Sequence, residues 1–156
     1  MNLSNIFFKF KFLYLTLLLL SCGYTPIYKN MDNTNLSIII TDTEGEGNIN
    51  TILKDKFRIY QNSESPNTYE IKIISNFKKI TLTKDNLGNA TNYRLILNVK
   101  ILTNKDKKDL SFDYNETFDI KKSGSLFDEE NYEKLIIKNM ISTIIDKFIF
   151  QISKIK

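Results

Sequence analysis

Three stretches of the chain, all between Tyr69 and Ile120, place apolar residues at every second position. Because side chains of a β-strand alternate between two faces, this spacing predicts strands with one apolar and one polar face. Residues 85–89 and 104–108 have the composition of turns and separate the stretches. The apolar rows are Tyr69, Ile71 and Ile73; Tyr93, Leu95, Leu97, Val99 and Ile101; and Leu110, Phe112, Tyr114, Phe118 and Ile120. The pattern therefore predicts a β-meander with one face in water.

The first of these stretches changes phase along its length. Ile80 and Leu82 fall on the opposite parity to Tyr69 and Ile73. One apolar face can be kept only if the strand is interrupted, because a shift of one residue turns every side chain over. We therefore expect a bulge or a break near Asn76–Lys79.

Upstream of the meander, the sequence predicts a short strand and a helix. The β-branched run Leu36–Thr41 is typical of a strand, and residues 42–48 are expected to form a loop. The next apolar residues recur at helical spacing, with Asn48 as a plausible N-cap and Pro66 beyond the end. These residues are Ile49, Ile52, Leu53, Phe57 and Tyr60.

The chain closes with its longest predicted element, a helix that begins at Ser125. The Ser125 hydroxyl is placed to cap the helix, and Asp128 completes a pair similar to a capping box. A helix lying on a membrane surface is one interpretation of its apolar stripe, but packing on the nearby sheet is favoured. The stripe comprises Ile137, Met140, Ile141, Ile144, Ile145, Phe148, Ile149 and Ile152. The order β-α-β-β-β-α predicts an α+β fold, with two helices on one face of a mixed or antiparallel four-stranded sheet.

The first 21 residues have the layout of an export signal. Lys9 and Lys11 supply positive charge, an apolar stretch runs to Leu20, and the small residue Ser21 precedes the only cysteine, Cys22. A membrane-spanning helix is one alternative, but a crossing needs about 20 apolar residues and the uninterrupted run is about half that length. An ordinary signal peptide followed by an incidental cysteine is the other.

The residues around Cys22 resemble a bacterial lipobox, with Leu19 three positions before the cysteine and Ser21 directly before it. In proteins with this motif the thiol carries diacylglycerol through a thioether, and the amine is often acylated too, for example with palmitate. Gly23 after the cysteine is similar to the pattern that is sorted to the outer membrane. The resemblance implies a lipoprotein signal peptide at 1–21, a lipidated tether at 22–35, and a single α+β domain at 36–156.

Charge and cysteine content restrict the binding partners that the chain can have and the cross-links that it can form. Without the two signal-peptide lysines, 20 basic residues face 18 acidic ones, a net charge of +2. This balance and the lack of any nucleic-acid motif argue against binding to nucleic acid. With one cysteine, the chain cannot form an internal disulfide.

Composition also restricts the chemistry. The chain has no histidine, which excludes His-based acid–base catalysis, nucleophilic triads that need histidine, and His-ligated metals. Gly45 and Gly47 are flanked by acids that would repel a phosphate. Carboxylates are scattered singly or stand at turns and helix starts, although a paired-carboxylate enzyme or an oxygen-ligand metal site stays open. We expect a protein that is not an enzyme, with no catalytic residues, no metal and no cofactor beyond the lipid at Cys22.

Several segments resemble one family, the lipopolysaccharide-assembly lipoproteins that plug an outer-membrane translocon barrel, in particular their alphaproteobacterial branch. The start 22–28, Cys-Gly-Tyr-Thr-Pro-Ile-Tyr, is similar to that branch's Cys-Gly-aromatic-x-Pro-aliphatic-Tyr. Further matches are 91–94 (Thr-Asn-Tyr-Arg), Tyr114–Asn115 and 125–127 (Ser-Leu-Phe), and the element order agrees over residues 22 to 152. The terminal helix departs from the family by being rich in Ile, Lys and Asn, and Asp128 replaces a usual alanine.

This resemblance implies a lipid-anchored protein on the periplasmic face of the outer membrane. Its partners would be a large β-barrel translocon and lipopolysaccharide, which it would help to deliver to the outer leaflet. Among the lysines and arginines of strands and turns, Arg94, Lys105, Lys107 and Lys108 are our candidate contacts for lipopolysaccharide phosphates, because cations attract phosphate and arginine binds it in a fork. The alternative for each is a solubilising surface charge.

Two rival functions stay open at this point. A periplasmic lipoprotein that binds a small lipid, or that serves as an accessory subunit of an ABC transporter, would share the anchor and the small α+β body. A lipid-anchored hydrolase would need two carboxylates in one pocket, at least one with a perturbed pKa.

Overall fold

The computed structural model describes residues 36–61, 65–105, 108–122 and 125–155, all within one compact unit. Cys22, the predicted signal peptide and the tether lie outside the described residues. The elements are β1 (Leu36–Gly45), α2 (Gly47–Phe57), the 3-10 turn η2 (Arg58–Tyr60), β2 (Asn67–Lys84), β3 (Ala90–Lys105), β4 (Lys108–Lys121) and α3 (Leu126–Ile152).

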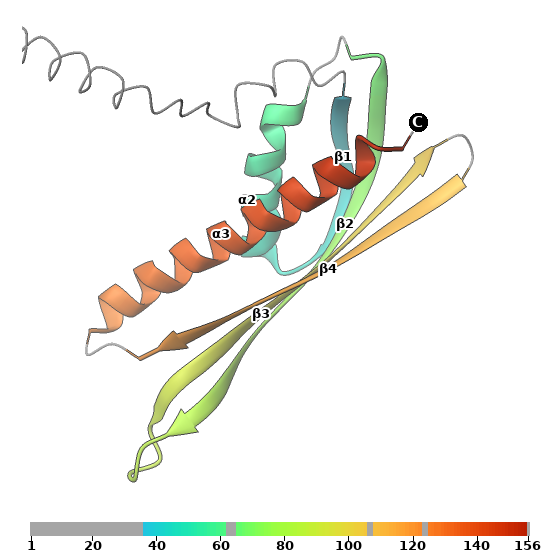
Figure 1. Cartoon of the computed structure of the whole chain (residues 1–156). Coiled ribbons are helices and arrows are strands. Elements are labelled where there is room, and N and C mark those ends of the chain that lie inside the picture. The colour runs from blue at the N-terminus through green and yellow to red at the C-terminus, as the bar shows by residue number, and fades with distance from the viewer. Residues whose placement is uncertain (1–35, 62–64, 106–107, 123–124, 156) are drawn as a thin grey trace, which may run out of the picture. The chain divides into compact units, whose positions relative to one another are not determined.

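The four strands form one mixed sheet in the order β1-β2-β3-β4. β1 runs parallel to β2 because α2 carries the chain back between them, whereas β2, β3 and β4 form an antiparallel meander. Both helices lie on the same face of the sheet (Figure 1). The predicted α+β fold and its β-α-β-β-β-α order are confirmed.

The predicted apolar rows form the inner sheet face. Each row has a buried centre, with Leu95, Leu97, Val99 and Ile101 of β3 almost fully covered. At the middle of the core, the ring of Phe148 on α3 packs edge-on against Phe57 of α2 and Phe112 of β4, with centroids 5.9 and 5.4 Å apart. Such aromatic contacts contribute beyond the area that they bury.

The expected break near Asn76–Lys79 is wrong. β2 and β3 pair without interruption from Ile71 to Thr81, and the register shifts only between Thr81 and Lys84. Ile80 consequently lies on the outer face, 41% exposed, and Leu82 stands at the register shift, 39% exposed. No bulge is needed at Asn76–Lys79, because the β2–β3 hairpin extends past the helical layer (Figure 1).

β1 is longer than the predicted Leu36–Thr41, since it continues to Gly45 through a bulge between Ile40 and Asp42. Asp42 and Glu44, which were expected in a loop, therefore belong to a strand. They are tolerated because Lys72 of β2 forms ion pairs with both Asp42, at 3.0 Å, and Glu44.

The connection from β1 to α2 depends on a glycine. Gly45 has φ +96°, and a Cβ there would lie 1.8 Å from the backbone oxygen of Ser75. The helix begins at Gly47 after Glu46, so the predicted N-cap role of Asn48 is wrong. Beneath this turn, the buried Asn50 side chain donates to Glu44 O (3.1 Å) and accepts from the Ser75 hydroxyl (2.8 Å).

α3 begins as predicted, with the Ser125 hydroxyl accepting a hydrogen bond from the Asp128 amide. Its buried stripe has Ile136 in place of the predicted Ile137, and the remaining members of the stripe are confirmed. Two side-chain contacts fix the helix on β4: Tyr114 donates to Gln151 (2.6 Å), and Lys147 pairs with Glu116.

Candidate functional site

The structure places Arg94 on the outer, water-facing side of β3. Its guanidinium donates two hydrogen bonds to the Asp119 carboxylate of β4, at 2.7 and 2.8 Å. These bonds raise the pKa of Arg94 and lower the pKa of Asp119 below its usual range. Arg94 therefore already has an anionic partner within the chain.

The other predicted phosphate contacts lie at the far end of the β3–β4 ribbon. Lys105 ends β3 and pairs in the strand register with Lys108, which is exposed. Lys107 lies outside the described residues. Arg94 and Lys105 are separated by eleven steps of one strand, roughly 36 Å at about 3.3 Å per residue, so the fold does not bring them together.

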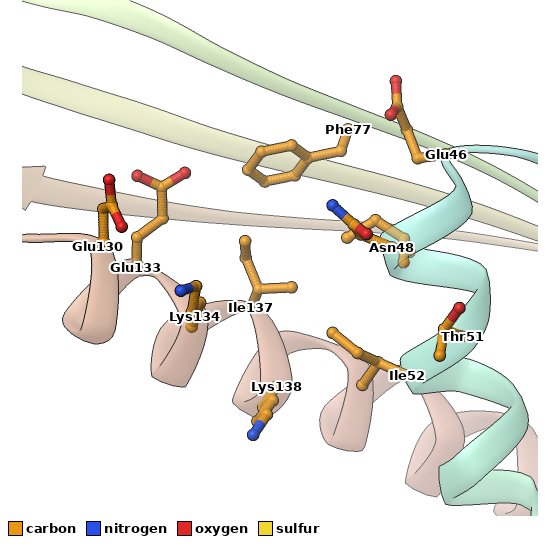
Figure 2. A pocket seen from close by; sticks show the side chains of 11 residues that line it. Glu46, Asn48, Thr51, Ile52, Phe77, Glu130, Glu133, Lys134, Ile137 and Lys138 are labelled. Atoms are coloured by element: carbon orange, nitrogen blue, oxygen red, sulfur yellow. The ribbon is translucent and has the colours of Figure 1, made fainter.

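A groove of about 560 Å³ lies between α2 and the N-terminal half of α3. Ile52 of α2, Phe77 of β2 and Ile137 of α3 all point into it (Figure 2). These three side chains are only partly buried. The volume falls within the range of small-molecule sites, and partly covered apolar walls are typical of them.

Charged residues surround this apolar floor. On the sheet side, Glu133 of α3 pairs with Lys79 of β2 at 2.5 Å. Lys134 and Lys138 line the side farther from the sheet, one helical turn apart, with Lys138 pointing away from the sheet (Figure 2). Glu46 is the N-cap residue of α2, where the helix dipole favours a carboxylate, and Glu130 lies in the second turn of α3.

Sequence reasoning missed this groove for identifiable reasons. Ile52 and Ile137 belong to the apolar stripes of their helices, and periodicity does not tell a covered position of such a stripe from one at the edge of the core. Phe77 continues the inner row of β2, but it fell within the segment where a break was expected. One signal could have indicated the groove. The buried stripe of α3 begins only at Ile136, ten residues after the helix begins.

Elsewhere, the described residues offer few reactive groups. No group of three or more His, Cys, Asp or Glu side chains in the described ranges is placed to hold a metal ion. Within the same ranges, no helix combines the length and the apolar character that a bilayer crossing requires.

Comparison with known proteins identifies the fold. No family model matches the chain, and no curated protein is significantly similar to it in sequence. Solved structures are similar. Rare lipoprotein B from Shewanella oneidensis has a TM-score of 0.55 and 16% identity over 76% of this chain and 92% of that one. An uncharacterized lipoprotein B from Nitrosomonas europaea has a TM-score of 0.52 and 14% identity over 76% and 81%. The chain thus has a fold that bacterial lipoproteins adopt.

Proposed function

We propose that the chain is an outer-membrane lipoprotein that acts as the structural plug and assembly partner of a β-barrel lipopolysaccharide translocon, and helps to deliver lipopolysaccharide to the outer leaflet. The observation that carries this proposal is the similarity of its fold to two bacterial lipoproteins, each matched over at least 81% of its length. The lipobox-like residues before Cys22 and the family resemblance of residues 22–28 support the same reading.

The outer sheet face suits a partner with a polar interior. Its middle row is neutral, since Asn76, Asn98 and Asn115 stand side by side in the register and Asn115 donates to Asn98 at 2.6 Å. Two pairs of charges on this face are matched within the chain, Arg94 with Asp119 and Lys100 with Asp113 at 3.8 Å, whereas Lys78, opposite Ile96 in the register, is exposed and forms none of the ion pairs found among the described residues. A polar barrel wall can cover such a face if it offers Lys78 an acidic or polar partner.

The anchor sets how far this body can move from the membrane. The 14 residues from Cys22 to residue 35 span at most about 50 Å when fully extended. Two or more acyl chains at Cys22 would make that attachment stable, whereas one chain alone holds only marginally.

We assign the chain no catalytic role. A carboxylate hydrolase needs a general acid with a raised pKa. The described carboxylates with perturbed pKa values, Asp42, Asp85 and Asp119, are all shifted downwards by hydrogen bonds, which favours their charged forms. Asp42 and Asp119 are occupied by Lys72 and Arg94.

The test is capture of the chain from its own envelope with a C-terminal tag after mild detergent extraction. The proposal predicts recovery of a large outer-membrane barrel protein together with lipopolysaccharide, and weaker recovery with a Cys22→Ala control. Recovery of an inner-membrane transporter ATPase complex would favour the ABC-accessory alternative, and recovery of neither would reject the proposal.

The phosphate contacts are a separate part of the proposal. The candidate contacts for lipopolysaccharide stay Arg94, Lys105, Lys107 and Lys108. Lys108 is better placed than Arg94 to bind a phosphate, because it is exposed and Arg94 is held by Asp119. Glutamate at these four positions is expected to reduce the lipopolysaccharide recovered with the complex. Unchanged recovery would remove the assignment.

A further inference from the structure

We infer that the groove between α2 and α3 holds the acyl chain of a phosphorylated membrane lipid, with the phosphate at Lys134 and Lys138. The inference rests on the proposed function for the origin of such a lipid, the cell envelope.

The floor of the groove is apolar surface that no described element covers. Ile52, Phe77 and Ile137 come from three different elements and converge on one space of about 560 Å³ (Figure 2). Removing apolar surface from water is favourable in proportion to its area, so an aliphatic chain laid here is stabilised without any movement of the fold.

The charged residues around the groove determine which lipid headgroup it can bind. Lys134 and Lys138 form none of the ion pairs found among the described residues, whereas Lys79 on the sheet side is already occupied by Glu133. The remaining rim acids, Glu46 and Glu130, lie near the starts of the two helices, at the N-cap of α2 and in the second turn of α3. An anionic headgroup is therefore repelled at these two ends and attracted to the side farther from the sheet, where Lys138 lies (Figure 2). The groove thus defines one orientation for an amphiphile.

The probe is dodecyl phosphate, titrated into the purified chain below the concentration at which it forms micelles and followed by NMR shifts of the groove residues. Affinity is expected to rise about fourfold for each methylene added from octyl to dodecyl phosphate, until the groove is filled. Butyl phosphate, which has the headgroup with a chain eight methylenes shorter, and dodecyltrimethylammonium, which has the chain with the opposite charge, are expected to bind at least about tenfold more weakly. Equal binding of the cationic and anionic amphiphiles would overturn the headgroup assignment.

Two variants locate the site. Ile52→Gln with Ile137→Gln changes only partly buried side chains and is expected to weaken binding about tenfold, with an unchanged circular dichroism spectrum. Lys134→Glu with Lys138→Glu is expected to weaken it by at least about fivefold, whereas the control Lys56→Glu with Lys84→Glu makes the same change in charge at exposed positions outside the groove and leaves it unchanged. Binding that is insensitive to both groove variants would reject the inference.

Failure of this inference can be told from failure of the proposed function. A chain that is captured with a barrel but shows no groove binding keeps the function and loses this site. A chain that binds dodecyl phosphate in the groove but is captured with no barrel keeps the site and loses the function.

Discussion

The two halves of α3 are held on the molecule in different ways. The C-terminal half is packed, with Phe148 between Phe57 and Phe112 and with Met140, Ile144 and Ile152 buried. The N-terminal half is held by the Lys79–Glu133 ion pair and leaves a groove beside Ile137. One helix is thus a core element in its C-terminal half, the closed half, and a wall of an open site in its N-terminal half, the open half.

The largest difference between the two halves should appear in stability. Phe148→Ala removes a fully buried ring and is expected to lower the free energy of unfolding by about 4 kcal/mol. Ile137→Ala, in the partly exposed groove, is expected to cost about 1 kcal/mol, because much of that side chain is already in water. Chemical denaturation followed by circular dichroism measures both, and equal losses would show that the open half is as tightly packed as the closed one.

Gly45 tests whether the turn into α2 fixes the open half. Gly45→Ala combines a left-handed backbone with a Cβ that would meet the Ser75 carbonyl, so we expect a loss of about 3 kcal/mol. Gly47→Ala is the matched control, because a Cβ at Gly47 meets nothing within 4 Å. A neutral Gly45→Ala would mean that this turn can be rebuilt without cost.

The sequence predicted the closed half better than the open one. The rows of β3 and β4 and the stripe from Met140 to Ile152 follow from local periodicity, because each is enforced by burial on one face. The Ser125 cap, at the open end of α3, follows from capping chemistry alone. The errors cluster where burial ends. The phase change at Ile80, the strand character of Asp42–Gly45 and the position of Ile137 all depend on what a neighbouring element covers or neutralises, which no single segment encodes.

The same limit applies to the candidate site. Basic residues on strands and turns can be counted from the sequence, but the pairing of Arg94 with Asp119 depends on the register of β3 and β4. The groove depends on the crossing of two helices and on Phe77 beneath them. Neither could be derived from periodicity.

The pH dependence of stability tests how well Tyr114 is buried in the closed half. Burial raises its pKa from 10.0 to about 12, so the unfolded chain loses the phenol proton first as the pH rises. The stabilisation from this group is therefore complete below pH 10 and is lost between about pH 10 and 12. Tyr114→Phe is expected to remove this part of the alkaline decline, as measured by unfolding at a series of pH values. An identical decline in both proteins would place the Tyr114 hydroxyl in water.

The smallest expected effect belongs to the exposed pair on the outer face. Arg94 lowers the pKa of Asp119, so the contribution of the pair is present above the ordinary aspartate pKa and is lost as the pH falls through the lowered value. In Arg94→Gln the Asp119 pKa is expected to rise towards 3.8, its ordinary value, in an NMR titration, with little change in stability. Arg58→Gln serves as a control, since Arg58 pairs with Asp55 instead. An Asp119 pKa that stays low without Arg94 would contradict the pairing.

Attachment through Cys22 is the step on which both the proposed location and the proposed partner depend. The intact mass of the chain purified from its native membrane tests it directly. The account predicts a polypeptide that begins at Cys22 and carries the added mass of diacylglycerol with or without a further acyl chain. A mass that corresponds to a free thiol with residues 1–21 still attached would contradict it.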